Sequence, residues 1–210
     1  MEIAWDRSGI RQRLNKDFYL SDDVVGLARE LLGKALCVDL GEGLCAGLIT
    51  ETEAYAGATD RASHAYGGRR TERTRVMYSA GGVAYIYLCY GMHSLFNVVT
   101  GSEGTPHAVL VRGIWPLEGL GLMQQRLGRS RVEAAHTRGP GKLSKALGIH
   151  HSMTGTDLLG NRIWIADVRV RPPDKSVRVT TRIGIDYAGD DAGRPYRFVW
   201  DTEDQRSFLG

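Results

Sequence analysis

The sequence is poor in cysteine and has no motif that would pair the few it contains. Cys37, Cys45 and Cys89 lie among apolar residues in a chain of 210 residues, and no C-x-x-C spacing occurs. An odd number of unpaired cysteines argues against a disulfide framework and against a zinc site. We therefore expect a reducing, cytoplasmic setting.

Segments typical of membranes and of secretion are also lacking. The N-terminal residues have no apolar run of the kind that a secretory signal needs. Residues 76–102 carry no Asp, Glu, Lys or Arg, but they include several glycines and hydroxyls together with His93 and Asn97. We interpret this stretch as strands, because lipid-exposed polar groups are costly. No membrane association is expected.

Motifs for catalytic metals, internal repeats and low-complexity linkers are absent as well. Neither HExxH nor paired CxxC occurs, so no metal and no other cofactor is expected. A chain of this length with 42% hydrophobic and 24% charged residues fits one soluble domain. We predict a single domain over residues 1–210, with residues 1–15 as a flexible tail.

Positive charge is present in two concentrated blocks, although the net charge is only +3. Residues 69–75 hold four arginines against Glu72, and residues 126–145 are also mainly basic. The C-terminal part is acidic. A cationic face suits a polyanionic partner, because Lys and Arg displace counterions from phosphates. A solvated surface is the alternative that charge alone leaves open. The residues concerned are Arg69, Arg70, Arg73, Arg75, Arg126, Arg129, Arg131, Arg138, Lys142 and Lys145, and the acids Asp186, Asp190, Asp191, Asp201, Glu203 and Asp204.

Strand patterns outnumber helical ones. A helix capped by Ser21 should end at Gly33, and further helices should begin at Pro116 and at Pro140. Strands are expected over residues 35–40, 44–55, 107–114, 162–170, 177–186 and 196–200, with a hairpin over 83–99 that turns at Tyr90 and Gly91. The pattern predicts an α+β fold: a compact domain with a curved, mostly antiparallel, open-barrel-like sheet, flanking helices and a protruding β-hairpin.

The stretch "ETEAY" carries closely spaced carboxylates. On a strand, Glu51, Glu53 and Tyr55 share one face, while Thr52 and Ala54 point to the other. Two partly desolvated carboxylates at close range tend to raise the pKa of at least one, which suits a general base. Two surface glutamates on an edge strand, or a structural ion pair, would give the same pattern.

Aromatic residues and one histidine lie near this stretch. His64, in the following loop, can donate to or accept from a ligand edge, although a lone histidine is more often structural. Tyr85 and Tyr87 alternate on one strand and would ordinarily pack in a core. Tyr90, at the hairpin tip, is harder to bury, and an exposed ring beside arginines suits stacking on bases or wedging between them.

Several ordered motifs together resemble the alkyladenine (3-methyladenine) DNA glycosylase family, in a short, bacterial-type form. They are "ETEAY", "HAYGGRRT", "YIYLCYGMHSLFNVV", "VLVRGIWPLEG", "GPGKLSKALGI", "RIGIDYAG" and "RPYRF", and they extend from about residue 20 to about residue 200. The resemblance implies a monofunctional DNA-repair enzyme that flips alkylated or deaminated purines out of duplex DNA and hydrolyses the N-glycosidic bond. The implied partner is damaged double-stranded DNA, bound by a monomer in the cytoplasm, at the nucleoid.

The resemblance also implies roles for the residues at matching positions. Glu53 matches the general base that activates water, with Arg112 and the backbone of Ile183 helping to place that water. The residues that match the base pocket are Tyr55, His64, Tyr87 and Asn97. Tyr90 and Met92 match residues of the hairpin that enters the minor groove, and Lys142 matches a basic residue near the DNA backbone; Arg69, Arg70 and Arg73 are expected to bind DNA as well.

The chain departs from the family pattern at three places. Thr74 stands where asparagine is usual, "SAGG" at residues 79–82 replaces a proline-rich turn, and His93 takes a position that is often aromatic. These differences concern loop geometry and groove contacts rather than chemistry. Because no lysine lies in the "ETEAY" or tyrosine motifs to form a Schiff base, hydrolysis without strand cutting is expected.

Two other readings explain parts of the sequence. "GPGKL" with Asp157 downstream is similar to the glycine loop of helix-hairpin-helix glycosylases, which need a mostly helical body. A non-catalytic nucleic-acid-binding module would explain the basic loops and the aromatic hairpin tip, but it leaves the carboxylates without a role.

Overall fold

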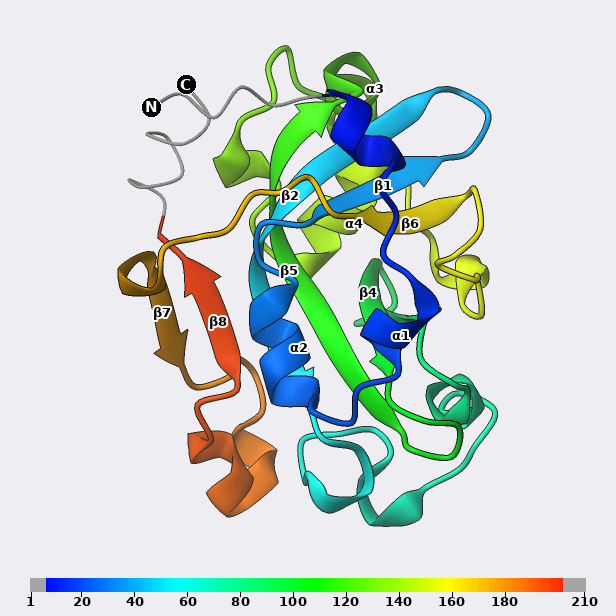
Figure 1. Ribbon diagram of the computed structural model, residues 1–210, viewed down its shortest axis with the longest axis vertical. Coiled ribbons are helices and arrows are strands. Elements are labelled where there is room, and N and C mark those ends of the chain that lie inside the picture. Colours follow the sequence, from blue (N-terminus) through cyan, green and yellow to red (C-terminus); the bar gives the residue numbers. More distant parts are fainter. Residues whose placement is uncertain (1–6, 202–210) are drawn as a thin grey trace.

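The computed structural model describes residues 7–201, which form an open, eight-stranded sheet in which every pairing is antiparallel (Figure 1). The order along the sheet is β3-β4-β5-β2-β1-β6, and β8 pairs with both β2 and β7. The predicted α+β fold with a protruding hairpin is confirmed, and a helix-hairpin-helix body is ruled out. The strands are β1 Ala35–Asp39, β2 Leu44–Tyr55, β3 Val83–Cys89, β4 His93–Thr100, β5 His107–Glu118, β6 Ile163–Ala166, β7 Val177–Thr180 and β8 Arg197–Trp200.

The long central strands β2 and β5 form the axis of the sheet. Their pairing runs from Ala46 opposite Glu118 to Tyr55 opposite Ala108, with irregularities around Glu51. From Glu51 to Glu53, β2 also pairs with β8 on its other side. Glu53 therefore lies opposite Arg197 of β8 on one side and opposite Leu110 of β5 on the other. The "ETEAY" stretch is thus held between two strands, and the reading of it as an edge strand is wrong.

The helices cover the sheet, but the helix predicted between Ser21 and Gly33 is shorter than expected at both ends. α2 (Val24–Glu30) lies across the sheet in front of β2 and β5 in Figure 1, and it follows the short α1 (Lys16–Tyr19). Its N-cap is Asp23, whose carboxylate accepts from the backbone N–H of Gly26; Ser21 instead accepts from the N–H of Asp23. The predicted Ser21 cap is therefore displaced by two residues.

The expected helix at Pro116 is wrong. Pro116 lies within β5, opposite Gly47 and next to a register shift, where a proline without an N–H is tolerated in a strand. Helix α3 (Leu120–Leu127) begins only after Gly119, whose φ of 75° makes the turn. By contrast, α4 (Pro140–Leu147) begins at Pro140 and is capped by Gly148, as predicted.

One buried cluster joins both groups of helices to the sheet. It contains Leu31 next to α2, Ile49 of β2, Phe96 of β4, Leu143 of α4 and Trp200 of β8, all with essentially no exposed surface. The described part of the expected tail is held against the sheet as well. Residue 14 belongs to this buried cluster, and its backbone N–H donates to the carbonyl of residue 165 on β6. Residues 1–6 of that tail lie outside the described residues.

Two predicted strands are shorter than expected because the chain turns away to make polar contacts. After β6, the Asp167 carboxylate accepts from the backbone N–H of Arg169, which has a positive φ of 59°. After β7, the chain leaves the sheet at Thr181. The Arg182 side chain then donates to the carbonyl of Ala54 at 2.8 Å. This second departure brings the "RIGIDYAG" segment beside the end of β2.

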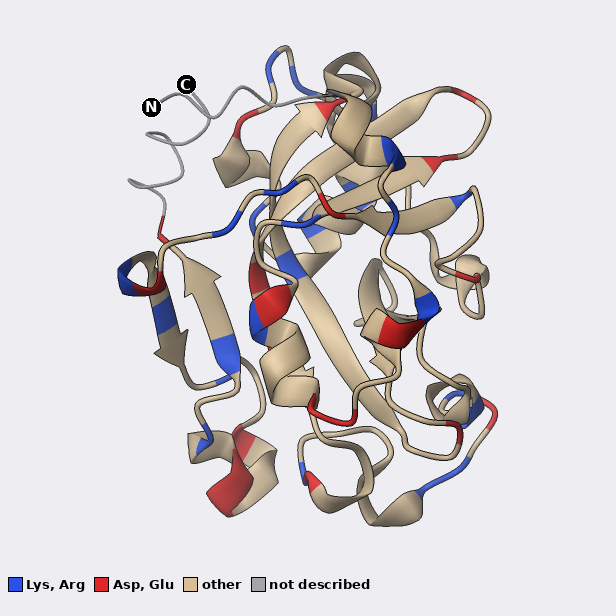
Figure 2. Ribbon diagram, in the orientation of Figure 1, with Lys and Arg blue, Asp and Glu red and all other residues tan. Residues whose placement is uncertain are grey.

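Charged residues are separated along the lower edge of the molecule as drawn in Figure 2. The arginine-rich loop, residues 69–75, lies at the lower right, and the acidic turn over Asp186–Gly193 lies at the lower left. Glu203 and Asp204, at the end of the predicted acidic region, lie outside the described residues. Within residues 7–201, no helix combines the length and the apolar character that a membrane crossing requires.

A buried ion pair ties the loop after β2 to the segment after β7. The Arg182 guanidinium donates to both carboxylate oxygens of Asp60, with Nη2 at 2.9 Å from Oδ1, and neither side chain has exposed surface. Burial alone would raise the pKa of Asp60, but the hydrogen bonds from Arg182 and from the backbone N–H groups of Ala56 and Ala62 lower it. Breaking one partner of such a pair leaves an uncompensated buried charge.

We expect Asp60→Asn to lower the free energy of unfolding by about 3–5 kcal/mol, since Arg182 would keep its charge without an ionic partner. Chemical denaturation measures this change. Asp174→Asn is the matched control: Asp174 also pairs with an arginine, Arg29 at 2.9 Å, but its side chain is 94% exposed. That control should change stability by less than about 1 kcal/mol. Equal losses in the two variants would contradict the structural role of the buried pair.

Candidate active site

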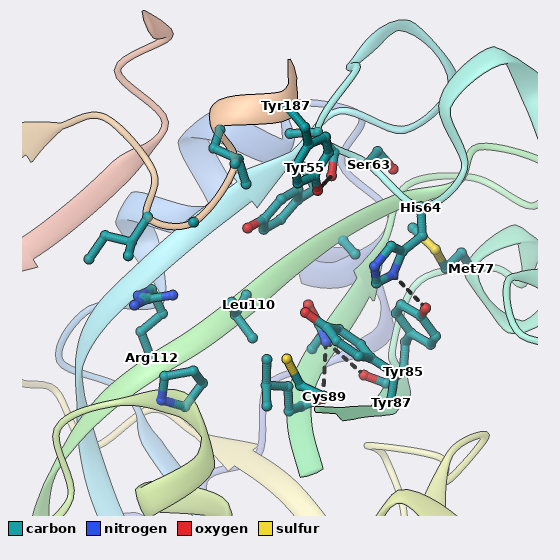
Figure 3. A pocket seen from close by; sticks show the side chains of 18 of the residues that line it. Tyr55, Ser63, His64, Met77, Tyr85, Tyr87, Cys89, Leu110, Arg112 and Tyr187 are labelled. Carbon is teal, nitrogen blue, oxygen red and sulfur yellow. Dashed lines mark hydrogen bonds between the residues drawn. The ribbon is translucent and has the colours of Figure 1, made fainter. Parts of the chain in front are cut away.

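A cavity of about 260 Å³ opens beside the β3–β4 hairpin. Figure 3 shows Tyr55 and Tyr187 on one side of it, with His64, Tyr85 and Tyr87 on the other and Leu110 between them. Because β2, β3, β4 and β5 are adjacent in the sheet, residues far apart in the sequence meet here. The predicted site residues that line the cavity are Tyr55, His64, Tyr87, Tyr90, Asn97, Arg112 and Ile183.

Glu53 does not line the cavity but lies directly beneath its wall, with no exposed surface. Its Oε2 accepts from the hydroxyl of Tyr55 at 2.9 Å and from Nη1 of Arg112 at 3.4 Å. Its Oε1 accepts from the backbone N–H of Ile183 at 2.8 Å. All three partners line the cavity, so the carboxylate is one layer away from the space that a ligand would occupy.

Burial raises the pKa of Glu53. The positive charge of Arg112 and the hydrogen bonds from Ile183 and Tyr55 act in the opposite direction without overcoming it. The direction agrees with the sequence-based expectation, but the cause differs. Glu51 is not the source of the shift, because its Oε1 is already balanced by Nε of Arg112 at 3.0 Å and Nε of Arg197 at 2.8 Å.

The two glutamates do share one side of β2, as the alternation predicts. Arg112 is within ion-pair distance of both. Thr52 points the other way, and its hydroxyl donates to the carbonyl of Ala28 in α2 at 2.6 Å. One face of β2 therefore belongs to the packed core, and the other supplies the carboxylates of the candidate site.

His64 is held as a neutral ring at the cavity wall. Its Nδ1 lies 2.8 Å from the hydroxyl of Tyr85, and its Nε2 lies 3.3 Å from Nη2 of Arg73 (Figure 3 draws the first contact). Burial, followed by the charges of Arg73 and Arg69, lowers the pKa of His64 to about 4. Since a guanidinium only donates, Nε2 accepts and the proton resides on Nδ1.

Asn97 and Tyr87 complete the inner wall. The side-chain amide of Asn97 donates to the carbonyls of Tyr85 at 3.0 Å and Leu95 at 3.2 Å, which fixes the orientation of a residue that is almost fully buried. The ring of Tyr87 makes an edge contact with His64, with centroids 4.6 Å apart. These contacts fix the orientation of both side chains.

The hairpin tip projects from the cavity mouth. Tyr90 is 89% exposed and Met92 is 71% exposed, although both are large and apolar. Tyr90 and Gly91 have φ values of 50° and 70°, and the backbone N–H of Met92 donates to the carbonyl of Cys89. This is a tight turn with left-handed central residues, a conformation that is strained for tyrosine. Strain of this kind concentrates at functional sites.

The remaining predicted residues surround the cavity without lining it. Arg70 and Arg73 line a separate groove of about 690 Å³ along the other side of β3. Arg69 is exposed on the same loop, and Lys142 is exposed in the first turn of α4. Among residues 7–201, no group of three or more His, Cys, Asp or Glu side chains is arranged to hold a metal ion.

Several residues of the cavity escaped the sequence analysis. Met77, Cys89 and Tyr187 line it, and Arg182 lies behind Tyr55, with its Cζ 4.8 Å from the ring centroid. Tyr187 and Arg182 belong to the "RIGIDYAG" motif, so their position next to Ile183 was a usable signal. Nothing in the local sequence marks Asp60 as the partner of Arg182, because it is a single acid in a polar loop.

Comparison with known proteins agrees with this geometry. A family model described as methylpurine-DNA glycosylase matches residues 17–204. A protein of Chlamydia felis is 45% identical over 187 residues, covering 89% of this chain and 95% of that protein. A protein of Chlamydia pneumoniae is 46% identical over 198 residues (93% and 99%), and one of Desulfitobacterium hafniense is 43% identical over 197 residues (89% and 94%). Each bears the name "Putative 3-methyladenine DNA glycosylase". The chain belongs to the methylpurine-DNA glycosylase family.

Proposed function

We propose that the protein is a monofunctional DNA glycosylase that removes alkylated or deaminated purines from duplex DNA. Its substrates would include 3-methyladenine, 7-methylguanine, hypoxanthine and ethenoadenine. The observation that carries this proposal is the buried carboxylate of Glu53 beneath a cavity whose walls are tyrosines. An acid of this kind serves water activation, and aromatic walls suit a flat, electron-poor base.

The reaction requires that the nucleotide leave the duplex, because the glycosidic bond is out of reach within the base stack. The exposed ring of Tyr90 at the cavity mouth is suited to fill the space that the nucleotide vacates, with Met92 beside it. The base would then lie between Tyr55 and Tyr87, with His64 at its edge. The arginines of residues 69–75 and Lys142 would bind phosphates of the duplex.

Glu53 would act on a water molecule at the cavity wall. The water oxygen forms a bond to C1′ of the sugar, its proton passes to the carboxylate, and the purine leaves with the electron pair of the broken bond. The 3.4 Å contact from Arg112 is the weakest of the bonds to Oε2, so this is where water can gain access. Anionic Glu53 would also stabilise the developing positive charge on the sugar.

A protein that only binds nucleic acid would explain the exposed tyrosine and the arginines equally well. A panel of duplexes that carry single lesions, assayed for free base, separates the two functions. Among residues 7–201 no lysine lines the cavity, which supports hydrolysis without cleavage of the strand. Binding without any release of base would exclude a glycosylase. We also propose that the protein acts as a monomer.

Replacing Glu53 by Gln should lower the single-turnover rate of base release by about 10²–10⁴-fold, the usual contribution of a general base. Affinity for the damaged duplex should stay nearly unchanged, because Glu53 is fully buried. The two quantities are measured by quenched release assays and by fluorescence anisotropy.

Glu51→Gln is the matched control for this variant. It lies two residues away on the same face and contacts the same arginine, but it is not bonded to a cavity residue other than Arg112. Its rate should fall by less than about tenfold. Near-normal turnover by the Glu53→Gln variant would remove Glu53 from the mechanism.

The rate of hypoxanthine release should decline at acidic pH, and the decline should begin at a higher pH than the titration of an ordinary glutamate would produce. Because burial raises the pKa of Glu53 in the folded protein, the carboxyl takes up its proton at a higher pH than an ordinary glutamate does. The active, ionised form is lost as the pH falls through that raised pKa, so the rate falls with it. His64, with a pKa of about 4, should add no step between pH 5 and pH 8.

The stability contribution of Glu53 has the opposite pH dependence. The folded state holds this proton more tightly than the unfolded state, so its contribution is full below the unfolded pKa and is lost as the pH rises through the folded pKa. A rate that stays constant down to the pH at which an ordinary glutamate takes up its proton would contradict the assignment of Glu53 as the base. Glu51→Gln should keep the acidic decline.

Tyr90→Ala should reduce nucleotide flipping and slow base release, most clearly for lesions that remain stably paired, because the vacated space in the stack is no longer filled. Ethenoadenine fluorescence reports the extruded base directly. Tyr90→Phe keeps the ring and should flip as the unmodified protein does. If all three proteins flip ethenoadenine equally, Tyr90 is not the wedge.

A further inference from the structure

Two arginines lie against the tyrosines that wall the cavity. Cζ of Arg182 is 4.8 Å from the ring centroid of Tyr55, and Cζ of Arg73 is 4.9 Å from that of Tyr87. Neither arginine is among the residues that line the cavity. Tyr87 lines both the cavity and the groove that contains Arg73, and Arg182 is fully buried. Each guanidinium therefore lies against a ring that lines the cavity without lining the cavity itself.

The two arginines differ in whether a carboxylate neutralises their positive charge. Arg182 is fully buried and is paired with Asp60, so the wall behind Tyr55 is nearly neutral. Arg73 is exposed, and within residues 7–201 no carboxylate lies in ion-pair distance of it. Its neighbour Glu72 pairs with Arg75 instead, at 3.4 Å. The wall formed by Tyr87 thus has a net positive charge behind it.

That charge acts on residues inside the cavity. Nη2 of Arg73 lies 3.3 Å from Nε2 of His64, so the histidine accepts from a cation. Arg73 is the largest cause, after burial, of the lowered pKa of His64. It also works against the effect of burial on the pKa of Tyr85 and of Tyr87. The positive potential of Arg73 therefore extends through the ring layer into the space that a base would occupy.

We propose that Arg73 is a specificity-determining residue that weakens the preference of the cavity for positively charged purines relative to neutral ones. This inference rests on the proposed function. The negative face of an aromatic ring attracts a cation, but a guanidinium on the outer face of Tyr87 repels a second cation on the inner face. Neutral bases, such as hypoxanthine, stack on the same ring without that repulsion.

The consequence is a broader range of substrates. Alkylated purines that carry a positive charge, such as 7-methylguanine, already leave easily, and an unopposed tyrosine pair would favour them further. Arg73 offsets this advantage at the binding stage. A single exposed side chain then adjusts the relative rates for charged and neutral bases, while Glu53 and Arg112 keep the same chemistry for both.

The test compares release of 7-methylguanine and hypoxanthine from duplexes of one sequence under single-turnover conditions. In Arg73→Met, which keeps an unbranched apolar stem but removes the charge, the ratio of the two rates should rise in favour of 7-methylguanine by about three- to tenfold. Arg73→Lys keeps the charge and should retain the original ratio. Arg75→Met, a neighbouring arginine that lines the same groove without contacting Tyr87, should leave the ratio unchanged.

Other outcomes would overturn the inference. If Arg73 acts only through a phosphate, Arg73→Met weakens binding of all duplexes alike, reduces the salt dependence of affinity, and leaves the ratio unchanged. Loss of release for both bases in the unmodified protein would instead refute the proposed function. Titration of His64 by NMR tests the electrostatic effect of Arg73 on the cavity without any substrate. The pKa of His64 should rise in Arg73→Met and in Arg73→Gln but not in Arg75→Met. An unchanged His64 pKa would refute the influence of Arg73 on the cavity.

Discussion

The site depends on one constraint: a buried carboxylate needs hydrogen-bond donors around it, because an unpaired buried charge is costly. Glu53 has no exposed surface, and it is supplied by a hydroxyl on its own strand, a guanidinium from β5 and a backbone N–H from the segment after β7. Each donor comes from a different element, so these elements cannot separate without leaving a buried acid unsatisfied. The same contacts that make Glu53 a candidate base therefore fix the geometry of the cavity wall.

Local patterns were sufficient to predict much of this arrangement. β2 begins and ends at the predicted residues, because the "GEG" turn precedes it and a polar loop that contains glycine follows the alternating "ETEAY" stretch. The hairpin turn at Tyr90 and Gly91 was equally clear, since a glycine between two apolar runs supplies the positive φ that a tight hairpin turn needs. The cavity residues on these strands followed from the family resemblance and from the side on which each residue points.

What could not be predicted depends on contacts between distant segments. Pro116 looked like the start of a helix, yet a neighbouring strand with a register shift accommodates it in β5. The strand expected over residues 177–186 ends early because Arg182 is drawn to Asp60, more than a hundred positions earlier in the chain. Likewise, two adjacent acids suggested mutual repulsion as the cause of the pKa shift, but arginines from β5 and β8 neutralise that repulsion and leave burial as the dominant effect.

The left-handed backbone at Tyr90 has a consequence for the rate of lesion search. Its torsion angle is already set in the free protein, and the turn is closed by the bond from Met92 to Cys89. If Tyr90 is the proposed wedge, it needs no ordering step when it meets a duplex. The time that the protein spends at each site would then be governed by how readily the base pair opens, so weakly paired, damaged positions would be sampled sooner than intact ones.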